Sequence, residues 1–131
     1  MGDQIAWCVA KEAQAVRRFS LSSGAVLEHY PVDDIRQVLL GDDKGAWVAP
    51  QTGRGLVYVG GGRTRAEPRA FFFPLDGAYT SENELWIVDG RQQLLSYSGV
   101  DESVQLTTVN SGLRTDYVNT VESMPDGSVW V

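Results

Sequence analysis

The sequence predicts an all-β fold built from repeated units of short antiparallel strands, and three observations support this prediction. Tryptophan recurs at spacings of 40, 39 and 44 residues, as Trp7, Trp47, Trp86 and Trp130. An acidic residue stands four positions before each tryptophan, and an aromatic residue follows each of the first three by 11 or 12 positions. Between these markers lie runs of four to seven residues rich in Val, Leu, Tyr and Trp, which favour strands.

Each unit resolves into strands that follow one another in the same order. We expect a first strand at residues 38–40 and 118–124, and the tryptophan-bearing second strand at 46–49 and 128–131. A third strand is expected at 16–20, 56–59 and 94–97, and a fourth at 25–30 and 104–109. The pair Asp126-Gly127 between two apolar runs is a strong hairpin signal, because glycine adopts the positive φ that such turns need.

Two stretches remain open to two interpretations. Residues 10–18 contain good helix formers, but their position between two expected strands favours a β-hairpin extension. In the third unit the first strand is either 70–74 or 75–79, and Pro74 argues against one continuous central strand.

A repeat of about 40 residues with four antiparallel strands is typical of a β-propeller blade. We therefore expect about three blades, with units near 3–42, 43–81 and 82–125 and a further unit starting at 126–131. Three blades do not close a propeller, which has about four to eight. The remaining blades belong either to further copies of the chain or to a longer protein. We expect the second, because both ends of the sequence fall within the same tryptophan-bearing strand.

The composition limits the classes of function. The 131 residues are 43% hydrophobic, which is enough for a core, and 17 acidic against 11 basic residues argue against a nucleic-acid partner. One cysteine, Cys8, excludes an internal disulfide and a multi-cysteine metal site, and we expect no cofactor. No apolar run reaches the roughly 18 residues that span a bilayer, so we expect no membrane contact by this segment.

The last 21 residues carry a recognisable motif: Gly112-Leu113, a polar stretch, a strand over 118–121, then Asp126-Gly127 and Trp130-Val131. This motif resembles the two-component-regulator propeller repeat, and residues 32–48 resemble it more loosely through Asp43 and Trp47. The resemblance implies the periplasmic or extracellular sensor propeller of a bacterial hybrid histidine kinase or diguanylate cyclase. Carbohydrate fragments are frequent signals in that family.

The leading hypothesis is thus a non-catalytic sensor or binding module, with carbohydrate as a candidate ligand and with no catalytic residues. One alternative is a propeller enzyme of the streptogramin lyase or lactonase type, and another is a purely protein–protein interaction propeller. An enzyme of this kind needs a metal held by carboxylates or a histidine in the channel. The single histidine, His29, falls on an expected outer strand, which disfavours acid–base catalysis.

Residues repeated in every unit are expected to build the units rather than to bind ligands. We interpret the four tryptophans as core between blades, and Asp43 and Asp126 as acceptors of backbone hydrogen bonds in turns. Cys8 is expected to be buried. Gly60-Gly61-Gly62 and the surrounding basic cluster (Arg54, Arg63, Arg65 and Arg69) are interpreted as a solvated loop, with an anion-binding site as the alternative.

Candidate ligand contacts come from the first strand of each unit, which lines the channel of a propeller. Polar residues break the apolar run there at Arg36, Gln37, Asn119 and Thr120, and Tyr117 stands in the loop before them. Adjacent side chains alternate between the two faces of a strand, so Arg36 and Gln37 cannot both point into the channel. The predicted ligand-binding residues are Arg36, Asn119 and Tyr117.

Overall fold

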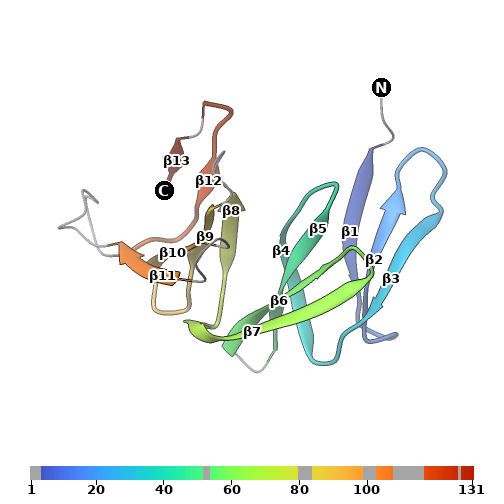
Figure 1. Cartoon of the computed structure of the whole chain (residues 1–131), viewed down its shortest axis with the longest axis horizontal. Helices are drawn as coiled ribbons and strands as arrows, with labels where there is room; N and C mark the ends of the chain where they lie inside the picture. Colours follow the sequence, from blue (N-terminus) through green and yellow to red (C-terminus); the bar gives the residue numbers. More distant parts are fainter. Residues whose placement is uncertain (1–3, 52–53, 80–83, 99–102, 108–116, 127) are drawn as a thin grey trace.

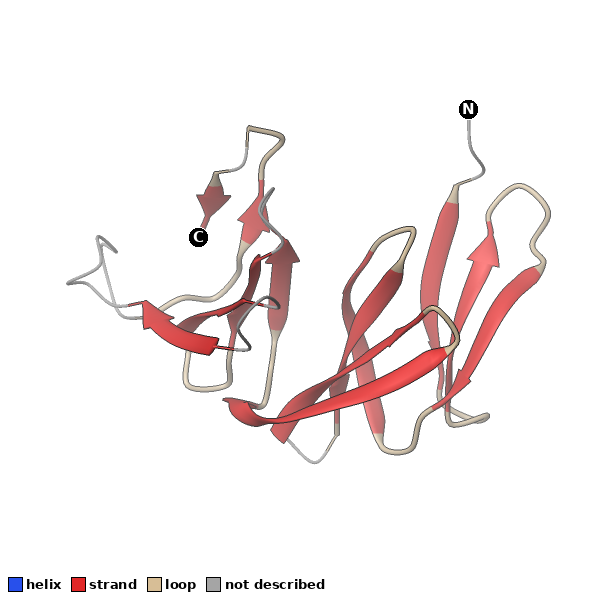
Figure 2. Cartoon of the chain, viewed as in Figure 1, coloured by secondary structure: helices blue, strands red, loops and turns tan. Residues whose placement is uncertain are grey.

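The computed structural model describes residues 4–51, 54–79, 84–98, 103–107, 117–126 and 128–131, and their regular elements are all strands (Figures 1 and 2). The predicted all-β class is therefore confirmed. The described part of the chain contains no helix of the length and apolarity that crossing a bilayer requires.

The strands form four antiparallel sheets in which each strand pairs with its neighbour in the chain. The first sheet consists of β1 (Ile5–Ala10), β2 (Ala15–Ser20) and β3 (Val26–Pro31). The second consists of β4 (Ile35–Gly41), β5 (Gly45–Pro50), β6 (Arg54–Gly60) and β7 (Arg63–Phe72). The third consists of β8 (Asp76–Tyr79), β9 (Glu84–Val88), β10 (Leu94–Ser98) and β11 (Ser103–Thr107), and the last is the pair β12 (Glu122–Ser123) and β13 (Val129–Trp130).

The tryptophans occupy equivalent places in these sheets. Trp47, Trp86 and Trp130 each lie on the second strand of their sheet, on β5, β9 and β13, whereas Trp7 lies on β1 at the edge of the first sheet. The residue paired with each tryptophan on the preceding strand is also equivalent: Leu40 with Trp47, Ala78 with Trp86 and Glu122 with Trp130. The sequence spacing thus corresponds to a spatial register.

The structure decides between the two interpretations of residues 10–18 and of residues 70–79. Residues 10–18 form the β1–β2 hairpin and no helix. Residues 70–72 end β7 in the second sheet, and β8 begins the third sheet at Asp76, so Pro74 lies between two sheets, where no ladder hydrogen bond is needed. The expected strand over 118–124 was too long, because only Glu122–Ser123 pairs with β13.

The expected solvated loop after Gly60 is wrong for Arg63 and Arg65, which lie on β7. Gly61 and Gly62 form a two-residue turn with φ of 59° and 75°, and two positive φ angles are what such a hairpin turn needs. The side chains of Arg54 and Arg69 lie outside the described residues. Glycine therefore reverses the chain tightly here and allows a fourth strand that the sequence interpretation missed.

The core lies between the sheets in three hydrophobic clusters. On β5, Ala46 and Val48 face the first sheet. Trp47 faces the opposite way and packs against Leu85, Ile87 and other apolar residues of the third sheet. The third cluster joins Val88 and Trp86 to the segment before β12. Alternation along each central strand thus lets one strand bury side chains against two neighbouring sheets.

The sheets approach most closely along their first strands. β4 contacts β8, and β8 contacts β12. At Gly77 a Cβ would lie 2.7 Å from Cδ2 of Leu40 and 2.9 Å from Cδ1 of Ile87, so only glycine fits between these side chains. Figure 1 shows β4, β8 and β12 as successive strands across the molecule, with their sheets spreading away from them.

Two expectations about burial are wrong at the ends of this row of sheets. Trp130 is 64% exposed, because no sheet in the described part of the chain covers its ring, whereas the third sheet covers Trp47, which is 5% exposed. Cys8 is also exposed, because it follows Trp7 on an edge strand and points to the opposite face of β1. The equivalent residues of the second sheet are buried: Trp47 corresponds to Trp130, and Val48 corresponds to Cys8.

Candidate functional site

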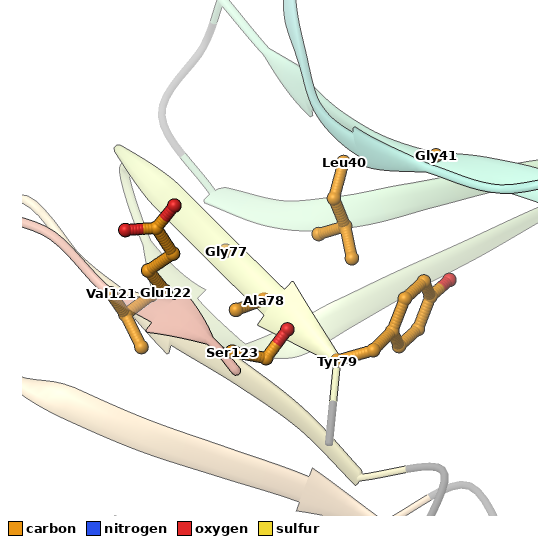
Figure 3. Close-up of a pocket in the computed structure, with 8 residues that line it drawn as sticks. All are labelled: Leu40, Gly41, Gly77, Ala78, Tyr79, Val121, Glu122 and Ser123. Carbon is orange, nitrogen blue, oxygen red and sulfur yellow. The ribbon is translucent and has the colours of Figure 1, made fainter. Parts of the chain in front are cut away.

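The candidate site is a pocket where the first strands of three sheets end side by side (Figure 3). Its volume is about 330 Å³, near the lower end of small-molecule sites. The lining residues are Leu40, Gly41, Gly77, Ala78, Tyr79, Val121, Glu122 and Ser123.

The lining comes from equivalent positions of three repeat units. The last two residues of the first strand are Leu40-Gly41 in β4, Ala78-Tyr79 in β8 and Glu122-Ser123 in β12, and the first residue of each pair lies opposite a tryptophan. Equivalent positions of three repeat units therefore contribute different residues to the same pocket.

The wall of the pocket is mixed, with aliphatic and aromatic surface beside polar groups that include two hydroxyl groups. Leu40, Ala78 and Val121 supply aliphatic surface, and Tyr79 supplies a ring and a phenol. In Figure 3 the side chains of Leu40, Tyr79 and Ser123 surround the space beside Ala78, whereas the Glu122 carboxylate points away from it. The pocket therefore offers hydroxyl groups and an aromatic ring to a ligand, and the carboxylate among its lining residues is directed away from the space beside Ala78.

The phenol of Tyr79 stays neutral over the physiological range. Burial raises its pKa strongly, and the nearby carboxylate of Asp42 raises it further, while a hydrogen bond with Trp47 acts in the opposite direction. Because the indole N–H can only donate, the Tyr79 oxygen accepts this hydrogen bond and its O–H remains a donor. A neutral donor beside an aliphatic wall suits a ligand hydroxyl or carbonyl oxygen.

Asp76 fixes β12 against β8 at the base of the site. Its Oδ2 accepts hydrogen bonds from the Thr120 hydroxyl at 2.6 Å and from the Val121 backbone N–H at 3.0 Å, and its Oδ1 accepts from Gly77 N–H at 3.0 Å. One carboxylate thereby sets the separation of two strands that line the pocket.

The predicted ligand residue Arg36 lies on β4 but does not line this pocket. Its guanidinium donates to the Pro74 carbonyl and lies 4.1 Å from the ring centroid of Phe73, and burial lowers its pKa. The neighbouring Gln37 donates to the Leu75 carbonyl at 3.0 Å. Both side chains hold the segment that connects the second and third sheets.

The other two predicted residues lie on the segment that leads into β12. Asn119 Oδ1 accepts a hydrogen bond from Gln92 Nε2 at 2.6 Å, and Tyr117 is 70% exposed. Neither lines the pocket. The structure therefore places Arg36 on β4, and Asn119 and Tyr117 on the segment before β12, outside the lining of this pocket.

The two repeated aspartates differ in their contacts. Asp126 Oδ1 accepts from the Ser128 backbone N–H at 2.9 Å, which confirms the predicted turn role. In the equivalent turn the acceptor is Asp42 rather than Asp43, and it binds the N–H groups of Lys44 and Gly45 at 2.8 and 3.0 Å. Two successive aspartates stand here, and the spacing of four residues to the tryptophan selected Asp43 although Asp42 is the acceptor. The two other repeated acids, Asp3 and Glu82, lie outside the described residues.

Other chemistry-bearing groups lie away from the pocket. His29 is exposed on β3, as expected, and its Nδ1 accepts a hydrogen bond from Arg17 Nε at 3.1 Å. Within the described residues, no group of three or more His, Cys, Asp or Glu side chains is placed to hold a metal ion.

Sequence reasoning missed Tyr79 and Ser123 as site residues, although the repeat contained a signal. Both stand one position beyond the residue paired with a tryptophan, where the second unit has Gly41. Aligning the units by that pair, rather than searching for polar residues within a strand, selects the three positions that meet in the pocket.

The chain matches no family model, and no curated protein matches it. What the site binds is therefore inferred from the side chains that line it.

Proposed function

We propose that this chain is a non-catalytic ligand-binding module made of β-propeller blades, and that the pocket at the ends of β4, β8 and β12 binds a small neutral ligand. The single observation that carries this proposal is the convergence of three equivalent strand ends on one pocket. The two four-stranded antiparallel sheets, which follow one another along the chain, support the propeller arrangement.

A carbohydrate fragment is the ligand class that fits best. An aromatic ring, aliphatic side chains and two hydroxyl groups match the apolar faces and hydroxyl groups of a sugar. The resemblance of residues 111–131 to the two-component-regulator propeller repeat supports the same class and a periplasmic sensor role.

The proposed mechanism is a ligand-dependent change in the arrangement of sheets. A ligand that contacts β4, β8 and β12 at once has its highest affinity for one particular spacing of the three strands. Binding therefore shifts the population toward that arrangement. Within a receptor, the shift would pass to the neighbouring domains.

A thermal-shift screen followed by calorimetry tests this function. The probes are neutral mono- and disaccharides, with uronic acids as charged comparisons. We expect a neutral sugar to raise the melting temperature, and Tyr79→Phe or Ser123→Ala to weaken its binding by roughly 2- to 10-fold, the effect of one lost hydrogen bond. Ser22→Ala, in the β2–β3 turn, is the matched control. Unchanged affinity in both pocket variants would contradict the proposal.

A further inference from the structure

Two of the repeated tryptophans form a hydrogen bond with the sheet that follows their own. The indole N–H of Trp7 donates to the backbone carbonyl of Asp42, directly after β4, at 2.9 Å. The indole N–H of Trp47 donates to the hydroxyl of Tyr79, the last residue of β8. In both cases the acceptor stands at the end of the first strand of the following sheet, which is the end that contributes to the pocket.

Trp86, the next tryptophan along the chain, does not follow this pattern. Its Nε1 atom is buried and has no hydrogen-bond partner among the described residues. The ring packs in the cluster that contains Ala78 and Val121, and the other side chains of this cluster are all apolar. A buried N–H without an acceptor is unfavourable and uncommon in folded proteins. The contact between the third sheet and the last sheet therefore lacks the hydrogen bond that the two preceding contacts have.

Ser123 is the residue at which the repeat places an acceptor for this N–H. It is the last residue of β12 and corresponds to Tyr79, one position beyond the residue paired with the tryptophan. Its hydroxyl has no hydrogen-bond partner in the part of the chain that the structure describes, and its side chain lies at the pocket beside Ala78 (Figure 3). A serine hydroxyl can accept one hydrogen bond while it donates another. Ser123 therefore has the chemistry to bind Trp86 as Tyr79 binds Trp47.

Asp76 attaches β12 to β8 just before Ser123. Its carboxylate accepts hydrogen bonds from the Thr120 hydroxyl and from the Val121 N–H. Ser123 lies two residues beyond this attachment, so a rotation of β12 about Val121 moves the end of the strand relative to Trp86 and keeps these two hydrogen bonds. The structure thus combines a fixed point on β12 with an unpaired acceptor at the end of the same strand.

We propose that ligand binding moves the end of β12 against Trp86, so that the Ser123 hydroxyl accepts the indole N–H and donates its own hydrogen to the ligand. This inference rests on the proposed function of the pocket and adds how the pocket responds. Tyr79 and Ser123 then present two equivalent donors to the ligand, each oriented by the tryptophan of the preceding sheet. Because the Trp86 hydrogen bond forms only in this arrangement, it favours the ligand-bound state. Trp86 is thus a positioning residue that acts through Ser123.

The indole resonances in a nitrogen–proton correlation spectrum of the full chain test this proposal, with cellobiose and maltose as the probes. Without sugar, the Trp86 proton should resonate upfield of the Trp7 and Trp47 protons, because hydrogen bonding moves an N–H proton downfield. With saturating sugar, the Trp86 resonance should move downfield, and that of Trp7, in the contact between the first and second sheets, should stay. The backbone amide of Gly77, which lines the pocket, shows independently whether the pocket is occupied.

Two variants of Ser123 separate a positioning role from a merely structural one. Ser123→Ala removes the acceptor, so the Trp86 resonance should stay in place even when the Gly77 amide shows that the pocket is filled. Filling it should take a sugar concentration roughly 2- to 10-fold higher, the effect of one lost hydrogen bond. Ser123→Thr keeps the hydroxyl and should restore the movement of Trp86. Ser22→Ala, in the β2–β3 turn, is the matched control and should behave as wild type.

The outcomes distinguish this proposal from the proposed function. A response of both Gly77 and Trp86 that needs the Ser123 hydroxyl supports both. A Gly77 response without movement of Trp86, or with the same movement in Ser123→Ala, overturns the inference and leaves the pocket as a ligand site. A Trp86 proton as far downfield as that of Trp47 before sugar is added also overturns it, because the N–H then already has an acceptor. No Gly77 response to any neutral sugar contradicts the proposed function itself.

Discussion

The ring of Trp47 lies edge-on against the ring of Tyr97, with 6.0 Å between centroids and 72° between planes, although the two residues belong to different sheets. The ring of Tyr58, in the same sheet as Trp47, lies 5.1 Å from the indole, measured between centroids. An edge-to-face pair of this kind adds to the free energy of apolar burial. Trp47 is thus one of the residues through which the second sheet packs against the third.

Trp47→Ala should lower the free energy of unfolding by about 3–5 kcal/mol, the cost of removing a buried large aromatic side chain. Trp130→Ala is the matched control, because its ring is 64% exposed and its loss should cost about 0.5 kcal/mol or less. Urea denaturation followed by circular dichroism at low protein concentration measures both. Equal losses would show that position in the repeat, rather than burial, determines the contribution.

Asp76→Ala should loosen β12 from β8. It removes the acceptor of the Thr120 hydroxyl and of the Val121 N–H, at a cost of about 1–3 kcal/mol. Amide hydrogen exchange should speed up at Val121 more than at Val118, whose N–H donates to the Gln92 carbonyl instead. Thr120→Val removes only the hydroxyl and should cost less. Exchange rates that rise equally at both amides would contradict a local role.

Glu28 should make stability depend on pH in the acid range. The hydrogen bond from Arg18 at 2.6 Å, and then the one from Tyr30, hold the pKa of Glu28 below its ordinary value of 4.5. Folding therefore favours the ionised carboxylate. Its contribution is complete above pH 4.5 and is lost as the pH falls through the lowered value.

The comparison of wild type with Glu28→Gln isolates this effect. Between about pH 7 and pH 5 the variant should be less stable by roughly 1 kcal/mol, the value of a partly exposed ion pair. The difference should shrink as the pH falls below 4.5, because the wild-type carboxyl then becomes neutral as well. A difference that stays constant down to about pH 2 would rule out the ion pair as its source.

Arg36→Ala should act on stability rather than on ligand affinity. Its guanidinium donates to the Pro74 carbonyl, lies over the Phe73 ring and does not line the pocket. Phe73 has a φ of 50°, which residues other than glycine rarely adopt. We expect a lower melting temperature and sugar affinity within about twofold of wild type. Asn119→Ala should behave similarly. A tenfold loss of affinity in the folded Arg36→Ala variant would instead support Arg36 as a ligand contact.

The sequence was sufficient for the fold class and for the position of most strands. The tryptophan period set the register, since Leu40, Ala78 and Glu122 pair with successive tryptophans. The sequence did not show that β7 exists, because charged residues and Pro68 interrupt its apolar pattern. Nor did it show that Cys8 is exposed, because the packing of the second sheet, and not the residues of β1 alone, decides which face of the first sheet is covered.

The site was harder to predict because it is made by convergence. Arg36, Gln37, Asn119 and Thr120 were selected as polar residues within a strand, yet each of them satisfies a backbone or side-chain group that joins two sheets. The pocket instead uses residues that are ordinary in sequence, such as Ser123 and Gly41. Only the juxtaposition of three strand ends gives them a common role.

Amide chemical shifts during a titration with cellobiose, maltose and other neutral sugars test the central claim most directly. A ligand in the proposed pocket should shift the resonances of Gly41, Gly77, Tyr79 and Ser123 in a saturable way. It should leave those of Glu28 and His29, on the far strand of the first sheet, unchanged. No saturable shift with any neutral sugar, or shifts that gather on β3 instead, would contradict the account.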